Sequence, residues 1–464
     1  MRDQIKTREK EKSYDKIRDL AYNTEAVVHF IGVGGVSMYS LARLTMYYGA
    51  SVSGSDRAEN DRTSDLMLLG AKISIGHAAK NVNGADLVVY TSAIGDANPE
   101  ILSARRQGII TVSRAEYMAA LMLDYSSRIG VSGSHGKSTT TAMLDLVFSA
   151  ANRNPTVLSG ADLSYGLPYK IGSKGLMIYE ACEYKDSFLK FSPDIAIGLN
   201  LELDHTDYFE GIDDIKKSFL MALGKARKFA IINGDDPNLR DIIPELKCPV
   251  ITFGANEGND YRYLVTSFRD DGFDFSVSRF GSVIGEFKLN IPGAFNLHNA
   301  TAAIVAALEE GIDVDTVSDA IRSYRGIRGR LEYIGSRHGR PVFLDYAHHP
   351  TEIRASVNAL RMYTKLPLTV VFKPHTYTRT ASLWGDFVSS LSLADYPVIT
   401  DIFAAREEPI EGISSQRLAA DIGRKAIYCP DYKVIETVDS STDGAILLMG
   451  AGDFKNIRKN ILNI

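Results

Sequence analysis

The sequence predicts an α/β protein of three domains, each built on a mostly parallel β-sheet. Short apolar runs alternate with helical stretches along most of the chain, which is the pattern of repeated βαβ units. Several of these runs end in glycine-rich or polar segments, as expected where strands meet at one edge of a sheet. The length of 464 residues fits three domains, since a domain typically has roughly 100–200 residues. We therefore expect ligands to bind above the carboxyl ends of these strands.

A charged extension over residues 1–25, which we expect to be solvated, precedes the first predicted domain, residues 26–124. The strands of that domain are expected at residues 26–31, 50–54 and 86–90. The first strand ends in the turn Gly32-Val-Gly34-Gly35, and Asp56 follows the second at the distance typical of a ribose-binding carboxylate. Ser37 replaces the third glycine of a dinucleotide fingerprint. A nicotinamide-dependent oxidoreductase and a purely structural turn therefore both stay open.

The second predicted domain, residues 125–335, contains the most informative segment of the chain, a glycine-rich loop at residues 133–139. A strand expected at residues 127–131 leads into this loop and a helix follows it, so backbone N–H groups and the helix N-terminus can face a phosphate. Lys137 is expected to neutralise the β- and γ-phosphates, and the Ser138 hydroxyl suits Mg²⁺. Two residues, not the usual four, separate Gly133 from Gly136, which makes this a contracted P-loop. The loop predicts nucleoside triphosphate chemistry.

Further polar residues follow the next strands of this domain. Glu180 ends a strand expected at residues 175–179, where nucleotide-binding sheets place a carboxylate that meets magnesium. His205 lies among four potential metal ligands or proton-transfer groups after a strand expected at residues 194–199. Asn296 and Asn299 open an alanine-rich helix and fit a base edge, although asparagine at a helix start is more often a cap.

The third predicted domain, residues 336–464, repeats the α/β pattern with strands at residues 341–344, 368–372, 396–400 and 445–449. Its first strand ends in Asp345-Tyr346-Ala-His348, and its second is followed by His375 and Arg379. Acidic, aromatic and basic side chains should therefore collect at the upper edge of this sheet.

Composition narrows the class of protein. A net charge of −5 provides no overall basic field for nucleic acid. The chain has no apolar run of the roughly 18 residues that a membrane span needs, and its charged N-terminus lacks the apolar segment of a signal peptide. Three scattered cysteines argue against a disulfide framework and a zinc cluster. We expect a cytoplasmic protein without membrane insertion, of an oligomeric state that the sequence leaves open.

Taken in order, these motifs resemble the Mur ligase family. The resemblance is carried by Gly-Val-Gly-Gly at 32–35, Gly-Ser-His-Gly-Lys-Ser at 133–138, Glu-Ala-Cys-Glu-Tyr at 180–184, Asn-x-Glu-x-Asp-His at 200–205, Pro-Gly-x-x-Asn-x-x-Asn at 292–299, Asp-Tyr-Ala-His-His-Pro-Thr-Glu at 345–352 and Pro-His-Thr-Tyr-Thr-Arg at 374–379. It implies a Rossmann-like N-terminal domain for a UDP-sugar, a central P-loop ATPase domain, and a Rossmann-like C-terminal domain that helps to hold an amino acid.

The reaction that the resemblance implies is ATP-dependent joining of L-alanine to the muramoyl carboxylate of UDP-N-acetylmuramate, in peptidoglycan precursor synthesis. ATP would phosphorylate the carboxylate with one or two Mg²⁺ ions present, and the amine would attack the acyl phosphate. The alternative within the family attaches a recycled tripeptide to the same nucleotide sugar. Cys182 and Thr376 depart from residues that many members share, and we leave both outside the predicted site.

The resemblance also assigns roles to individual residues of this chain. UDP-sugar binding falls to Gly34, Gly35, Asp56, His77 and Ser92. ATP binding falls to Gly133, Ser134, His135, Gly136, Lys137, Ser138, Thr139, Asn296, Asn299, Arg330 and Asp345. Metal binding falls to Ser138, Glu180 and His205, and contacts with the amino acid or acceptor to Tyr346, His348, His375 and Arg379. The expected catalytic residues are Lys137, Glu180, His205, His348 and Arg379, with the identity of any general base open.

Overall fold

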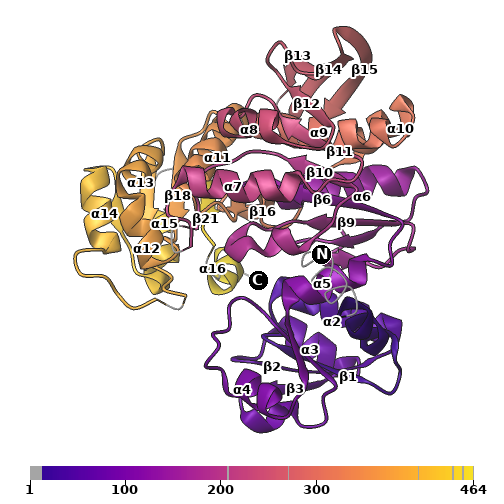
Figure 1. Cartoon of the computed structure of the whole chain (residues 1–464). Helices are drawn as coiled ribbons and strands as arrows, with labels where there is room; N and C mark the ends of the chain where they lie inside the picture. The colour runs from indigo at the N-terminus through magenta and orange to yellow at the C-terminus, as the bar shows by residue number, and fades with distance from the viewer. Residues whose placement is uncertain are drawn as a thin grey trace.

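The structure is a computed structural model that describes residues 13–205, 208–269, 271–405, 407–440, 444–451 and 454–462. Its three β-sheets follow one another along the chain and form three lobes (Figure 1). The N-terminal lobe lies at the bottom of the view, the central lobe above it, and the C-terminal lobe to the left. Thr206 and Asp207, which follow His205 in the predicted ligand segment, lie outside the described residues.

The N-terminal domain has a five-stranded parallel sheet in the order β3-β2-β1-β4-β5. The strands are β1 (Val27–Ile31), β2 (Ser51–Asp56), β3 (Lys72–Ile75), β4 (Leu87–Tyr90) and β5 (Ile110–Ser113). The helices are α2 (Val36–Tyr48), α3 (Asp61–Leu68), η1 (Ala79–Val82), α4 (Pro99–Arg106) and α5 (Arg114–Met122). The strand order reverses between β1 and β4, and a crevice at such a switch point is where open α/β sheets bind ligands. The turn after β1 and the segment after β4 therefore meet at the expected ligand edge.

The central domain has a ten-stranded sheet in the order β15-β14-β13-β12-β11-β10-β6-β9-β7-β8. Its parallel part joins β6 (Ser127–Ser132), β7 (Thr156–Leu158), β9 (Leu176–Glu180), β10 (Ile195–Gly198), β11 (Phe229–Asn233), β12 (Val250–Gly254) and β13 (Tyr261–Arg269). Antiparallel pairing adds β8 (Tyr169–Lys170) at one edge, and β14 (Gly272–Arg279) and β15 (Ser282–Leu289) at the other. Strands β13, β14 and β15 form a ribbon that rises above the lobe (Figure 1). This ribbon was not predicted from the sequence.

Helices on both sides complete the central domain. They are α6 (Lys137–Ala150), η2 (Tyr184–Lys190), α7 (Ile212–Leu223), α8 (Pro237–Ile242), η3 (Ile243–Glu245), α9 (Phe295–Glu309) and α10 (Val314–Ser323). The alanine-rich α9 packs against α6, the helix that follows the P-loop, and its alanines are fully buried. Small side chains allow the two helices to approach closely, which brings the start of α9 next to the P-loop.

The C-terminal domain has a six-stranded sheet in the order β16-β17-β21-β18-β19-β20, parallel except for the β16-β17 pair. The strands are β16 (Glu332–Arg337), β17 (Arg340–Asp345), β18 (Leu368–Phe372), β19 (Tyr396–Ile399), β20 (Ile427–Tyr428) and β21 (Ala445–Met449). The helices are α11 (Pro350–Tyr363), α12 (Tyr377–Ser382), α13 (Trp384–Leu391), α14 (Ser415–Ile422), η4 (Asp431–Lys433), α15 (Val434–Ser440) and α16 (Lys455–Ile461). Strand β16 crosses the domain boundary expected between residues 335 and 336.

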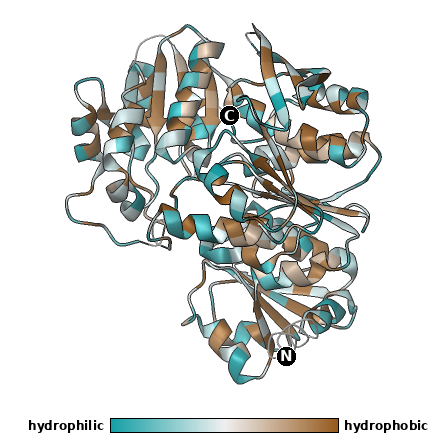
Figure 2. Cartoon of the chain, turned by 45° about the horizontal axis from the view of Figure 1, so that its top comes forward, coloured by the Kyte–Doolittle hydropathy of each residue, from teal (hydrophilic) through white to brown (hydrophobic). Residues whose placement is uncertain are grey.

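The predicted fold class, three α/β domains with mostly parallel sheets, is confirmed. Hydrophobic residues concentrate in the strands, whereas the helices carry hydrophilic residues as well (Figure 2). Among the described residues, no helix is both long and apolar enough to cross a membrane.

The extension before the first domain departs from the expectation that it is solvated. Residues 13–22 form a helix, and Ile17 and Ala21 are buried in the hydrophobic core shared with the N-terminal domain. Two residues four apart lie on one face of a helix, so this face packs while the charged residues stay outside. Residues 1–12 of the extension lie outside the described part.

Candidate active site

The P-loop lies between β6 and α6 and is held open by glycine. Gly136 has a φ of +84°, which L side chains rarely adopt. A Cβ atom on Gly136 would lie 2.3 Å from Oδ1 of Asn299, at the start of α9. The backbone N–H of His135 donates to Oδ1 of Asn200 at 2.8 Å, which ties the loop to the segment after β10. The loop thus presents its backbone and the N-terminus of α6, an arrangement suited to a phosphate.

Lys137, the first residue of α6, is held by a buried carboxylate. Its Nζ lies 3.0 Å from Oε2 of Glu183, whose side chain is 1% exposed. Burial alone would lower the pKa of Lys137, but Glu183 outweighs it and the pKa is raised. The same attraction lowers the pKa of Glu183 despite its burial. Both groups therefore remain charged at neutral pH. The ammonium also donates to the backbone carbonyls of Gly133 and Ser134, so a phosphate that approaches the loop must replace one of these bonds.

The three predicted metal ligands come from three segments around this lysine. Ser138 follows it in α6, Glu180 ends β9, and His205 lies in the loop after β10 with a φ of +54°. Glu180 accepts hydrogen bonds from the Ser159 hydroxyl and the backbone of Gly160. Nε2 of His205 lies 3.5 Å from Oε1 of Glu183. The hydroxyl and carboxylate oxygens suit Mg²⁺, whereas the imidazole is an unusual ligand for so hard a cation.

A cavity of about 240 Å³ lies between the central and C-terminal domains, and we call it the central–C-terminal cavity. The central domain lines it with Gly136, Ser138 and Thr139 of the P-loop region and with His135. Asn296, Asn299, Arg330 and Asp345, all predicted to contact ATP, also line it. The structure therefore brings part of the P-loop and the four distant ATP candidates to one cavity. Gly133, Ser134 and Lys137, also predicted to contact ATP, are not in its lining.

Asp345 is an acid in this cavity whose pKa is raised. It is buried, it accepts a hydrogen bond from the Ser356 hydroxyl, and Arg330 lines the same cavity. Burial raises its pKa to about 6, against the opposing effects of Ser356 and Arg330. A carboxyl group of this kind changes its charge when a cation or phosphate arrives beside it.

A second cavity, of about 310 Å³, lies between the N-terminal and central domains, and we call it the N-terminal–central cavity. The N-terminal domain contributes Gly35, Ser92 and Arg114, and the central domain contributes Lys137 and Glu180. Cys182, which the sequence analysis left outside the site, lines it as well. At the start of α6, Lys137 therefore lines the N-terminal–central cavity, whereas Gly136 and Ser138 on either side of it line the central–C-terminal cavity.

The predicted UDP-sugar residues separate into two groups. Gly35 and Ser92 line the N-terminal–central cavity, whereas Gly34, Asp56 and His77 do not. The backbone N–H of Gly34 donates to Oδ2 of Asp56 at 2.8 Å, so these two lie together after β1 and β2. His77 lies 3.0 Å from the Ser55 hydroxyl and 3.3 Å from Oε2 of buried Glu100. All of these residues lie at the carboxyl edge of the N-terminal sheet.

The four residues expected near the amino acid lie close to one another in the C-terminal domain. The rings of His348 and His375 are 6.0 Å apart, and Tyr346 packs on His348 at 5.3 Å. Nη1 of Arg379 lies 3.0 Å from Nδ1 of His375, and its Nη2 donates to Oδ1 of Asp204 at 2.8 Å. Arg379 therefore joins this group to the central domain.

The electrostatics of this group follow from burial and from Arg379. Burial and the guanidinium lower the pKa of His348 and of His375 to about 4, so both imidazoles are neutral at physiological pH. Although burial opposes it, Arg379 holds the pKa of Asp204 well below its usual range. The group combines a fixed positive charge with two neutral imidazoles, which suits an amino acid that has both a carboxylate and an ammonium group.

Several residues that connect these parts were not predicted from the sequence. Glu183 binds Lys137, Asp204 binds Arg379, and Glu352 of α11 lies 3.0 Å from Nδ1 of His135. Each belongs to a motif that was recognised, but its partner lies in a distant segment of the chain, so no signal in the sequence identified the pair. Arg114 gave no signal either, because nothing in its sequence neighbourhood distinguishes it from an ordinary helix start.

The fold and the two cavities define an α/β nucleotide-binding protein in which a P-loop stands between a phosphate site and a second ligand site. Comparisons with known proteins agree with this class. The family descriptions "Mur ligase family, catalytic domain", "Mur ligase middle domain" and "Mur ligase, glutamate ligase domain" match residues 27–126, 131–307 and 329–454. The chain belongs to the Mur ligase family.

Individual relatives cover nearly the whole chain. A UDP-N-acetylmuramate--L-alanine ligase of Clostridium novyi is 40% identical, over 94% of this chain and 97% of that protein. A protein of the same name from Alkaliphilus metalliredigens is 41% identical, over 94% of this chain and 96% of that one. The crystal structure of UDP-N-acetylmuramate-alanine ligase from Thermotoga maritima superposes with a TM-score of 0.81 at 27% identity, and covers 94% of this chain and 98% of that chain. The oxidoreductase considered for the first glycine turn has no support from these relatives.

Proposed function

We propose that this protein is an ATP-dependent ligase that joins L-alanine to the muramoyl carboxylate of UDP-N-acetylmuramate. One observation supports this most strongly: Gly136 and Ser138 line the central–C-terminal cavity, while Lys137 between them lines the N-terminal–central cavity. A triphosphate in the first cavity and a carboxylate in the second would meet at this lysine. The names of the relatives specify the substrates.

In the first step, the acceptor carboxylate attacks the γ-phosphorus of ATP, and ADP leaves. Two anions must approach each other, and the Lys137 ammonium, kept charged by Glu183, reduces their repulsion. We assign Ser138, Glu180 and His205 to Mg²⁺, which when bound supplies further neutralisation of the transferring phosphoryl group. Asn296, Asn299, Arg330 and Asp345 hold the rest of the nucleotide in the central–C-terminal cavity.

In the second step, the alanine amine attacks the acyl phosphate, and the tetrahedral intermediate expels inorganic phosphate and leaves an amide. We assign Tyr346, His348, His375 and Arg379 to the amino acid and the acceptor carboxylate. The Arg379 guanidinium suits a carboxylate, and the neutral imidazoles can accept a hydrogen bond from the amine. The acyl phosphate is sensitive to water, so the domains must enclose it during the attack.

For the UDP-sugar, we assign Gly34, Gly35, Asp56, His77 and Ser92, at the carboxyl edge of the N-terminal sheet. Gly35 and Ser92 line the same cavity as Lys137, which supports a nucleotide sugar that extends from this edge towards the P-loop. We place the protein in the cytoplasm, since its three cysteines are free and thus fit a reducing compartment.

The test is a product assay with purified protein, ATP, Mg²⁺ and UDP-N-acetylmuramate. Alanine, glycine, serine and the tripeptide are supplied separately, and the product mass is read. The proposal expects the alanyl product and phosphate release that requires both acceptor and amino acid. Preferential addition of the tripeptide would assign the chain to the sister ligase, and phosphate release without an acceptor would contradict a ligase.

A further inference from the structure

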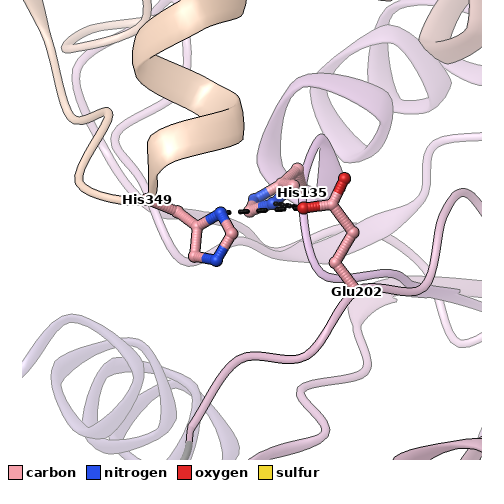
Figure 3. Close-up of side chains that lie close together, drawn as sticks. All are labelled: His135, Glu202 and His349. Carbon is pink, nitrogen blue, oxygen red and sulfur yellow. Dashed lines mark hydrogen bonds and ion pairs between the residues drawn. The ribbon is translucent and has the colours of Figure 1, made fainter. Parts of the chain in front are cut away.

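Three side chains outside the predicted metal site form a compact group, the His135–Glu202–His349 cluster (Figure 3). His135 belongs to the P-loop, Glu202 follows β10, and His349 is the N-cap of α11. Their candidate ligand atoms all lie within 4.8 Å of one another. Figure 3 shows both imidazoles turned towards the Glu202 carboxylate, with His349 at the start of its helix.

Two of the three spacings in this cluster, those that involve Glu202, suit a tetrahedral ion. Oε2 of Glu202 lies 3.4 Å from Nε2 of His135 and 3.6 Å from Nδ1 of His349. Zinc binds nitrogen and carboxylate oxygen at roughly 2.0–2.2 Å, so neighbouring ligand atoms in a tetrahedron are about 3.3–3.6 Å apart. Two imidazoles and one carboxylate are also a frequent zinc ligand set, with the fourth position left open. Mg²⁺ prefers oxygen ligands and fits this set less well.

The surroundings orient both imidazoles. Nδ1 of His135 lies 3.0 Å from Oε1 of Glu352, a residue whose carboxylate also accepts the backbone N–H groups of His348 and His349. A carboxylate on one nitrogen of a histidine favours metal binding at the other nitrogen. The His349 side chain caps α11: its Nδ1 accepts a long hydrogen bond of 3.4 Å from the backbone of Thr351, and the capping box adds the backbone N–H of Glu352. An ion at Nδ1 would replace these cap contacts. Nε2 of His349 is buried and has no hydrogen-bond partner among the described residues.

We propose that the His135–Glu202–His349 cluster binds Zn²⁺, and that the bound ion clamps the C-terminal domain onto the central domain and inhibits turnover. The inhibition rests on the proposed ligase function, whereas the binding does not. His135 and Glu202 belong to the central domain and His349 to the C-terminal domain, so one ion bridges the two. Asn296 and Asp345 are buried in the cavity between these domains, and His135 and Glu202 line the same cavity. An ion that holds the domains together at this point would therefore hinder the exchange of a nucleotide with the cavity.

Zinc competes with a proton at this position. Carboxylates flank both nitrogens of His135, Glu352 at Nδ1 and Glu202 at Nε2, and they favour a proton on each nitrogen. Binding forms the Zn–Nε2 bond and releases the proton on Nε2 to solvent, while the proton on Nδ1 stays with Glu352.

The binding test uses the full chain without nucleotide and compares two histidine variants. His349→Asn keeps an oxygen that can cap α11 but removes the nitrogen ligand. His338→Asn is the matched control, since His338 is 67% exposed and its φ of +50° is one that asparagine tolerates. Titration with Co²⁺, followed by its tetrahedral visible absorption, and displacement by Zn²⁺ give the affinities.

We expect one ion per chain in the wild type and in His338→Asn, and affinity at least tenfold weaker in His349→Asn. Equal affinity in all three proteins, or a dissociation constant for zinc above about 100 μM in the wild type, would overturn the site. A thermal melt confirms that each variant is folded before titration.

The inhibition test measures ligation at saturating Mg-ATP with increasing Zn²⁺. We expect zinc to inhibit the wild type and His338→Asn at the concentrations that fill the site, and His349→Asn to require at least tenfold more zinc. Zinc that binds without slowing turnover would refute the clamp. A wild type that binds zinc but ligates nothing would refute the proposed function and leave the site standing, so the two failures are distinguishable.

Discussion

At the scale of single residues, the Lys137–Glu183 pair keeps a charged ammonium at the P-loop. The pair places a charged ammonium between the two cavities. We expect Lys137→Met to lower kcat by at least about 10²–10³-fold, because a cation that stabilises transferring charge is removed. UDP-N-acetylmuramate affinity, measured by calorimetry, should change little. Lys228→Met, at a half-exposed lysine on the surface, is the control. An equal loss of ligation and of UDP-sugar affinity would show that the cavities are wrongly assigned.

Asp345 gives the protein a pH dependence of defined sign. Its pKa is raised to about 6, above the value of roughly 3.9 in an unfolded chain. Its contribution to stability is therefore fully present below about pH 4 and is lost as the pH rises through about 6. Asp345→Asn should gain stability relative to the wild type between pH 4 and pH 7, by up to about 3 kcal/mol. Urea unfolding at several pH values measures this, with exposed Asp386→Asn as the control. A difference that stays constant with pH would contradict the account.

At the scale of elements, the start of α6 depends on the absence of a side chain at Gly136. Two effects combine there: a φ of +84°, and a Cβ atom that would lie 2.3 Å from Asn299. We expect Gly136→Ala to abolish measurable ATP binding and to destabilise the protein by about 1–3 kcal/mol. Gly339→Ala separates the two effects, because it has a φ of +78° but open space for the Cβ atom. If both variants bind ATP with wild-type affinity, the close packing of α9 against the P-loop is not required for ATP binding.

The strands also show which parts of the fold can be predicted from the sequence. The runs at residues 368–372 and 445–449 are β18 and β21, because buried parallel strands are continuous apolar runs. The ribbon of β13, β14 and β15 was not predicted, since polar and exposed residues interrupt its apolar pattern. The burial of Ile17 was not predicted, because the apolar face of its helix consists of only Ile17 and Ala21 among charged residues.

The sequence predicts site residues where a short motif determines the local chemistry. It does not predict contacts between segments that are distant in the chain. The loop residues Gly136, Ser138 and Thr139 line one cavity together with Asn296, Asn299, Arg330 and Asp345, and their contact with ATP stays a prediction. The contacts of Glu352 with His135 join segments 217 positions apart, and spacing along a chain cannot show them.

At the scale of the whole molecule, one buried ion pair joins the C-terminal domain to the central domain. Arg379 from α12 bonds Asp204 after β10, and neither side chain is more than 11% exposed. We expect Arg379→Ala to raise the KM for alanine or the acceptor by at least about tenfold, with ATP affinity spared, because a carboxylate partner is removed. Steady-state kinetics with each substrate varied in turn will measure this. Arg361→Ala, which removes a half-exposed pair with Asp395, is the control. Loss of ATP binding in Arg379→Ala alone would contradict the assignment.

We propose that the start of the P-loop lies between two ligands, so that a carboxylate in one cavity takes the terminal phosphoryl group from a triphosphate in the other. The most direct measurement uses UDP-N-acetylmuramate labelled with ¹⁸O in the lactoyl carboxylate, and mass analysis of the inorganic phosphate released during ligation. Transfer through an acyl phosphate moves one carboxylate oxygen to phosphate in every turnover, so the account predicts labelled phosphate in step with amide formation. Unlabelled phosphate alongside a normal yield of amide would contradict it.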